Sequence, residues 1–180
     1  MAFKESTTVS YPPQQVFEGL INRDFQVYVS DGLNANIDQF SVAPSEPAPE
    51  DTVAVTIHRS VEGEQIADRL PSAVQRFVKG RVNIEQAEAW SAAADDGSRD
   101  ANITIKVPLA KATGTATIKL YPTEDGSGTV VDIEGSVKST IPLMGSKIAQ
   151  LAEPQVGKLL TGMTTKLGAW LKELCVFKFK

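Results

Sequence analysis

The sequence has very little of the chemistry that metal sites and disulfides need. Its 180 residues include one cysteine, Cys175, and one histidine, His58. A single cysteine excludes an internal disulfide and a cysteine-built zinc site, and a single histidine argues against a multi-histidine metal centre. No serine lies in a Gly-x-Ser-x-Gly elbow, so that type of hydrolase nucleophile is absent as well. We therefore expect neither a metal nor another cofactor.

Positive charge and long apolar runs are also scarce. Eighteen basic and 22 acidic residues give a net charge of −4, which argues against general nucleic-acid binding. The N-terminus carries charges where a signal peptide is apolar, and no stretch approaches the roughly 20 apolar residues that span a bilayer. Because 42% of the residues are apolar, the chain can bury a substantial core. We expect a cytoplasmic protein with a single domain over residues 1–180.

Alternation of apolar and polar residues with a period of two dominates the middle of the chain. This pattern is typical of strands with one buried face, and it predicts strands over 52–61, 81–90, 102–109, 112–121 and 129–138. Turn-forming residues at 94–98 and 124–128, and prolines at 44–49, predict hairpin connections. An antiparallel sheet of about six or seven strands follows from these segments.

Helical spacing of apolar residues brackets this sheet. It predicts helices over 14–22, 24–32 and 71–79, the last stopping at Gly80. The strongest pattern runs from about 143 to 174, with a broad apolar side and lysines opposite. Pro154 interrupts this pattern, and we expect a kink there. The class is therefore α+β, with an antiparallel sheet wrapped around one long C-terminal helix.

The order of these elements resembles the helix-grip fold of the START-like (SRPBCC, Bet v 1-like) superfamily. The residues that carry the resemblance are Tyr11-Pro12, Val16-Phe17, Leu70-Pro71, Phe77-Val78, Trp90, Gly114 and 141–145, and they span nearly the whole chain. Within the superfamily the chain is similar to an actinobacterial domain family of unknown function. The resemblance implies a cavity between sheet and C-terminal helix that holds lipids, sterols, polyketides or other apolar molecules.

Small residues on the apolar faces of two strands point to the same hollow. Gly114 and Ala116 lie on one such face, and Gly135 lies on the next. Small inward side chains leave space, but glycine also permits close approach of a helix or marks a bulge, and the sequence does not decide between these explanations.

Gln86 and Glu88 alternate in phase with the apolar residues of their strand. If that face is inward, they are polar groups in an apolar space, and burial would raise the pKa of Glu88. We favour the alternative that a bulge or strand end turns Glu88 outward. His58 falls opposite the apolar residues of its own strand, and we expect it to face solvent beside Arg59.

The leading hypothesis is a non-enzymatic carrier or sensor of an apolar small molecule or lipid. The helix over 71–79 would form a mobile rim of the cavity, although Trp90, Met163 and Trp170 fit a filled core equally well. The candidate ligand contacts are Phe77, Val78, Gln86, Trp90, Ile105, Gly114, Ile133, Leu159, Met163, Leu167 and Trp170.

Two alternatives belong to other functional classes. In the first, a cyclase- or dehydratase-like enzyme uses Glu88 as acid or base. The second starts from charge, because residues 138–180 contain seven lysines and only two acidic residues. Lys147, Lys158 and Lys172 on the long helix would then make transient contact with a membrane surface or an acidic partner, unless they are simply a solvated face. The sequence does not define the oligomeric state.

Overall fold

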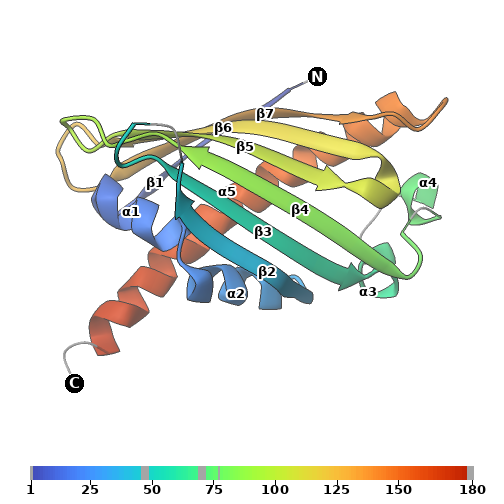
Figure 1. Ribbon diagram of the computed structural model, residues 1–180, viewed down its shortest axis with the longest axis horizontal. Helices are drawn as coiled ribbons and strands as arrows, with labels where there is room; N and C mark the ends of the chain where they lie inside the picture. The colour runs from blue at the N-terminus through green and yellow to red at the C-terminus, as the bar shows by residue number, and fades with distance from the viewer. Residues whose placement is uncertain (1, 46–48, 69–71, 77, 178–180) are drawn as a thin grey trace.

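Seven strands form one antiparallel sheet, and a long C-terminal helix lies across its inner face (Figure 1). The computed structural model describes residues 2–45, 49–68, 72–76 and 78–177. The strands are β1 (Phe3–Val9), β2 (Ala35–Pro44), β3 (Val53–Glu62), β4 (Arg81–Trp90), β5 (Arg99–Val107), β6 (Ala112–Pro122) and β7 (Thr129–Ser139). The predicted helix-grip architecture is confirmed, with strand order β1-β7-β6-β5-β4-β3-β2.

Pairing between neighbouring strands places their inward-facing residues side by side, in rows that run across the sheet. In one row, Gln86 of β4 pairs with Ile105 of β5, which pairs with Gly114 of β6. In the next row, Glu88 pairs with Ile103, and Ile103 pairs with Ala116. Directly opposed residues have Cβ atoms about 5 Å apart on the same face of the sheet. The two polar residues of β4 therefore stand beside two isoleucines of β5.

Two helices follow β1, as the spacing predicts. They are α1 (Pro13–Leu20) and α2 (Arg23–Asp31). Proline in the first turn suits α1, because its fixed φ is helical and its missing N–H would have no helical partner there. The Oδ1 of Asn22 caps α2 by accepting hydrogen bonds from the backbone N–H groups of Asp24 and Phe25.

The helix predicted over 71–79 is present only in part. The structure has two short helices between β3 and β4, namely α3 (Gly63–Ala67) and α4 (Ser72–Gln75). Gly80 does not end a helix. It has a φ of +72° in the connection to β4, where its carbonyl accepts a 2.7 Å hydrogen bond from the N–H of Gly63. Phe77, expected at the rim, lies outside the described residues.

Strand β5 ends earlier than the alternation predicts. A short 3₁₀ helix, η1 (Pro108–Ala110), begins directly after Val107, because Pro108 has no N–H to continue the ladder. The prediction that Leu109 belongs to the inward face is therefore wrong. Leu109 is 46% exposed in this turn.

The C-terminal helix α5 (Gly145–Phe177) continues through Pro154 without interruption. The kink expected there stays a prediction. The helix packs closely on β1 at Gly157, where a Cβ atom would lie 3.2–3.4 Å from Glu5 and Phe3. Near the end of β7, the Oε1 of Glu153 accepts a 3.1 Å hydrogen bond from the N–H of Val137, which ties α5 to the sheet. No helix in the described ranges is long and apolar enough to cross a membrane.

Candidate ligand cavity and its polar wall

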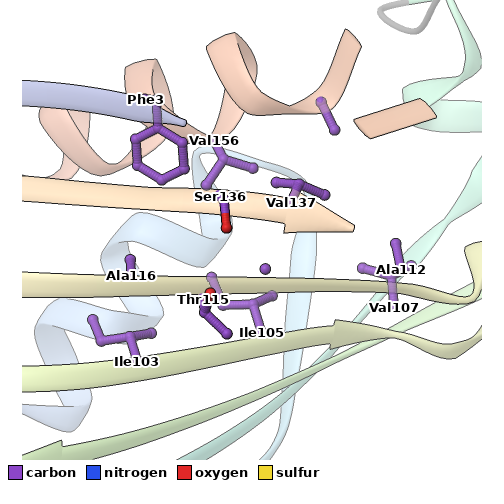
Figure 2. Close-up of a pocket in the computed structure, with 12 residues that line it drawn as sticks. Phe3, Ile103, Ile105, Val107, Ala112, Thr115, Ala116, Ser136, Val137 and Val156 are labelled. Atoms are coloured by element: carbon purple, nitrogen blue, oxygen red, sulfur yellow. The ribbon is translucent and has the colours of Figure 1, made fainter. Parts of the chain in front are cut away.

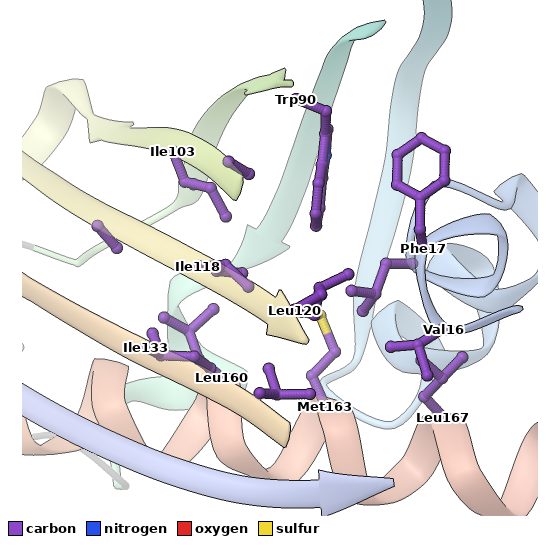
Figure 3. Close-up of a cluster of buried hydrophobic side chains, with 14 of the residues drawn as sticks. Val16, Phe17, Trp90, Ile103, Ile118, Leu120, Ile133, Leu160, Met163 and Leu167 are labelled. Carbon is purple, nitrogen blue, oxygen red and sulfur yellow. The ribbon is translucent and has the colours of Figure 1, made fainter. Parts of the chain in front are cut away.

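One end of the space between the sheet and α5 is filled with large side chains (Figure 3). Trp90 of β4 meets Phe17 of α1 edge to face, with ring centroids 5.2 Å apart. Leu167 of α5 is fully buried below them. The same cluster contains Val16, Phe25, Ile103, Ile118, Leu120, Ile133, Leu160 and Met163. We call this region the filled end.

The opposite end, towards the start of α5, is hollow (Figure 2). A partly enclosed cavity of about 100 Å³ lies between the sheet and the helix, and its walls are almost entirely apolar. It is lined by Phe3, Ile103, Ile105, Val107, Ala112, Gly114, Thr115, Ala116, Ser136, Val137, Ala152 and Val156. We call this region the hollow end. Because four of its lining residues are alanine or glycine, the space follows directly from missing side-chain volume.

The two inward glycines, Gly114 and Gly135, lie in different surroundings. A Cβ atom on Gly114 would make only ordinary van der Waals contacts at 3.9 Å, and this glycine lines the cavity. On Gly135 a Cβ atom would overlap the carbonyl oxygen of Thr115 and crowd the ring of Phe3. Gly114 therefore contributes to the cavity, whereas Gly135 allows close packing.

A buried hydrogen-bond network crosses the interior beside the cavity. Arg59 of β3 is its centre, and its side chain is 7% exposed. Its Nε donates to Ser30 Oγ at 2.9 Å, Nη1 donates to Gln86 Oε1 at 2.7 Å, and Nη2 donates to Gln26 Oε1 at 2.5 Å. Gln26 in turn donates from Nε2 to the carbonyl oxygen of Leu20 at 2.6 Å. The guanidinium thus ties α2 to the sheet.

Glu88 completes this network and points inward. Its Oε1 accepts a 2.5 Å hydrogen bond from Gln86 Nε2, and its Oε2 accepts a 2.7 Å bond from the indole Nε1 of Trp90. Burial raises its pKa, while the bonds from Trp90 and Gln86 and the charge of Arg59 act in the opposite direction. The expectation that a bulge or strand end turns Glu88 outward is wrong, because β3, β4 and β5 pair in continuous register on either side of it.

The expectation that His58 faces solvent beside Arg59 is wrong for Arg59. His58 is half-buried on the outer face, but Arg59 does not lie beside it in solvent. Strand alternation places Arg59 on the inner face with Ile57, and desolvation lowers the pKa of its guanidinium, opposed by the charge of Glu88. The alternation of β3 could have indicated that Arg59 faces inward, whereas its partner Gln86 follows only from the pairing of β3 with β4.

The predicted ligand contacts separate into three groups. Ile105 and Gly114 line the cavity, and Gln86 lies in the polar network next to it. Trp90, Ile133, Met163 and Leu167 belong to the filled end, and Trp170 packs on its margin against Phe25. Val78 is buried in a separate small cluster with Ala35, Val61 and Val82, and Leu159 is 44% exposed on α5. Ligand contact by any of them stays a prediction.

Several residues that line the cavity are not among the ligand contacts predicted from the sequence. Phe3, Ala112, Ala152 and Val156 come from three different elements. The small residues Ala112 and Ala152 carried a signal of missing volume, but only the strand register and the helix position bring them together.

These features define a class of protein: a helix-grip fold with an apolar cavity under its C-terminal helix. Similar folds are found in TTHA0849 from Thermus thermophilus (TM-score 0.55, 14% identity, 94% of this chain and 98% of that chain). A START superfamily protein from Mycobacterium smegmatis is similar to the same degree (TM-score 0.55, 10% identity, 96% and 98%).

The sequence also matches a family directly. Residues 4–171 match the family described as a protein of unknown function, DUF2505, and the chain belongs to this family. No curated protein matches the sequence. The actinobacterial distribution expected from the resemblance stays a prediction.

Proposed function

We propose that the protein binds an apolar small molecule or lipid at the hollow end, as a non-enzymatic carrier or sensor in the cytoplasm. The observation that carries this proposal is the unfilled apolar space at Gly114. Protein interiors normally pack to a density of about 0.75, so an apolar void of this size is costly to keep. A cavity that a ligand fills recovers those lost contacts.

The volume of the cavity limits what fits without movement. A cavity of about 150 Å³ accommodates benzene, and the hollow end measures about 100 Å³. A ligand of the size of benzene or larger therefore requires α5 to move away from the sheet. The wall beneath Val156 and Ala152 is the helix segment that would have to yield.

The enzyme alternative finds less support in the geometry. A general acid or base must reach the substrate within hydrogen-bond distance. Both oxygens of Glu88 are held by Gln86 and Trp90, and the side chains of Ile103 and Ile105 line the cavity beside it. We therefore assign Glu88 a structural role in the buried hydrogen-bond network. We call this network of Gln26, Ser30, Arg59, Gln86, Glu88 and Trp90 the polar wall.

The test begins with protein purified from its native host. Solvent extraction and mass spectrometry, against a boiled blank, should reveal an apolar compound in stoichiometric amount. Gly114→Val would fill the cavity and should remove that compound while the protein stays folded. Thr117→Val, on the exposed face of the same strand, is the matched control and should retain it. Equal ligand content in both variants, or an empty protein that also fails to take up toluene by NMR, would refute the proposal.

A further inference from the structure

Two exposed leucines project from neighbouring turns at the hollow end. Leu143 is 102% exposed in the connection between β7 and α5, and Leu109 is 46% exposed in η1. The turns are tied together: the N–H of Thr140 donates to the carbonyl of Lys111 at 3.1 Å, and Ser139 Oγ donates to the carbonyl of Ala110 at 2.9 Å. The β7–α5 connection protrudes at the right of the view in Figure 1. We call these two turns the leucine tip.

Leu143 occupies a backbone position that disfavours leucine. It has a φ of +64° and follows Pro142, and the N–H of Met144 donates to the carbonyl of Ile141 at 3.2 Å. This is the third position of a type II turn, where glycine or asparagine is the usual residue. A leucine there strains the backbone, because its Cβ atom crowds the carbonyl oxygen, and it gains nothing from burial within the chain. Strain combined with complete exposure points to a contact outside the chain.

The two segments that form the leucine tip carry charge of one sign, and Glu85 of β4 lies opposite Lys106 on the neighbouring strand. Residues 106–113 and 136–150 contain Lys106, Lys111, Lys138 and Lys147 and no aspartate or glutamate. All four lysines are exposed. Apolar side chains surrounded by lysines fit a surface with anionic headgroups above an apolar layer, and each lysine near such a surface contributes about 1 kcal/mol.

We propose that the leucine tip docks on an anionic lipid bilayer, with Leu143 and Leu109 inserted at the level of the headgroups and acyl chains. The cavity lies directly behind this tip, because Val107 and Val137 line it at the ends of the strands that lead into the two turns. Docking would therefore bring the hollow end to the membrane surface. This surface differs from the basic face of α5, since it is built from turns and depends on two leucines.

Vesicle sedimentation tests the proposal on the full chain. The protein should bind vesicles of phosphatidylcholine mixed with phosphatidylglycerol, should bind phosphatidylcholine alone weakly, and should dissociate at high salt. Leu143→Asn should reduce the partition coefficient at least about tenfold, which corresponds to about 1.4 kcal/mol, because the variant loses the apolar burial of the leucine side chain. Asparagine accepts the positive φ, so the variant should be at least as thermostable as the wild type. Leu109→Gln should act in the same direction.

Matched controls lie elsewhere on the molecule. Leu174 is 41% exposed near the far end of α5, and Leu174→Gln should leave binding unchanged. The double variant Lys111→Gln/Lys138→Gln should weaken binding and flatten its salt dependence, whereas Lys158→Gln/Lys172→Gln should not. In addition, the fluorescence of Leu143→Trp should shift to the blue on anionic vesicles.

Two results would overturn the proposal. One is a lack of binding to anionic vesicles at low salt. The other is binding that survives Leu143→Asn and Leu109→Gln but is lost in Lys158→Gln/Lys172→Gln, which would move the contact to the face of α5. Neither result bears on cavity occupancy, which the extraction experiment measures separately.

Discussion

The filled end and the hollow end lie under the same helix and on the same sheet, yet they are packed in opposite ways. At the filled end, Trp90, Phe17 and Leu167 interlock, and the guanidinium of Arg99 lies 4.0 Å from the ring centroid of Phe17. At the hollow end, four of the twelve lining residues are glycine or alanine, and an apolar space stays open between the sheet and α5. The fold therefore does not determine how full its interior is.

The two ends have different roles: the filled end stabilises the fold, and the hollow end is the proposed ligand site. Large interlocked side chains at the filled end hold α1, α2 and α5 on the sheet. The hollow end contributes fewer contacts and is the part of the interior that can change volume at low cost. Substitutions at the two ends should consequently differ in their effect on the free energy of unfolding.

The largest effect is expected at the polar wall. Arg59→Met would leave Gln26, Ser30 and the carboxylate of Glu88 without their buried cation, and we expect it to lower the free energy of unfolding by about 4 kcal/mol. Arg81→Met is the control, because Arg81 pairs with Asp38 at 2.8 Å on the surface with 58% of its side chain exposed. Its cost should stay below about 1 kcal/mol. Urea denaturation measures both, and equal costs would contradict a supporting role for the network.

Truncation on the two halves of α5 tests the contrast directly. Leu167→Ala removes a fully buried side chain at the filled end, and it should cost about 3 kcal/mol. Val156→Ala enlarges a space that is already open, and alanine favours the helix, so its cost should be below about 1 kcal/mol. If chemical denaturation gave the two variants similar midpoints, the interior would not be divided as described.

The two inward glycines provide a smaller and more selective test. Gly135→Ala forces a Cβ atom against the Thr115 carbonyl and should destabilise the protein by about 2 kcal/mol. Gly114→Ala adds a Cβ atom that makes only ordinary van der Waals contacts and restricts the unfolded chain, so it should stabilise by about 0.5 kcal/mol. The opposite signs are measurable as opposite shifts of the melting temperature.

The sheet could be predicted from the sequence because β6 and β7 alternate strictly and end in hairpin turns. The segment between β3 and β4 could not, since its short helices depend on the backbone contact between Gly63 and Gly80. Leu109 was misplaced because the alternation continues past Val107, where Pro108 already ends the ladder.

The candidate site was only partly predictable, for a related reason. Gly114 and Gly135 look alike in sequence, and only the folded positions of the Thr115 carbonyl and the Phe3 ring show that Gly135 is closely packed and Gly114 is not. Glu88 was expected to face outward because a lone carboxylate is costly to bury. Its hydrogen-bond partners Gln86 and Trp90 share its strand, but the cation that accompanies them, Arg59, comes from β3. Local periodicity carries no information about such partners.

Glu88 also gives the polar wall a distinctive pH dependence. Because burial raises its pKa in the folded protein, the folded state holds this proton more tightly than the unfolded chain. Stability from this group is therefore greatest at low pH, and it is lost as the pH rises from the ordinary glutamate pKa through the raised value. Asp125 acts with the opposite sign, since hydrogen bonds from Thr123 and Ser127 lower its pKa to about 2.

The contribution of Glu88 can be isolated as a difference between two proteins. Glu88→Gln cannot ionise, so the wild type minus variant difference in unfolding free energy should decline as the pH rises, while Asp125 and the other carboxylates cancel. Chemical denaturation across the acidic to neutral range measures this difference. A difference that stayed constant with pH would mean that Glu88 ionises as readily in the folded protein as in the unfolded chain. In such a protein the charge of Arg59 and the hydrogen bonds from Gln86 and Trp90 would offset the whole effect of burial on the pKa of Glu88, or the carboxylate would reach solvent.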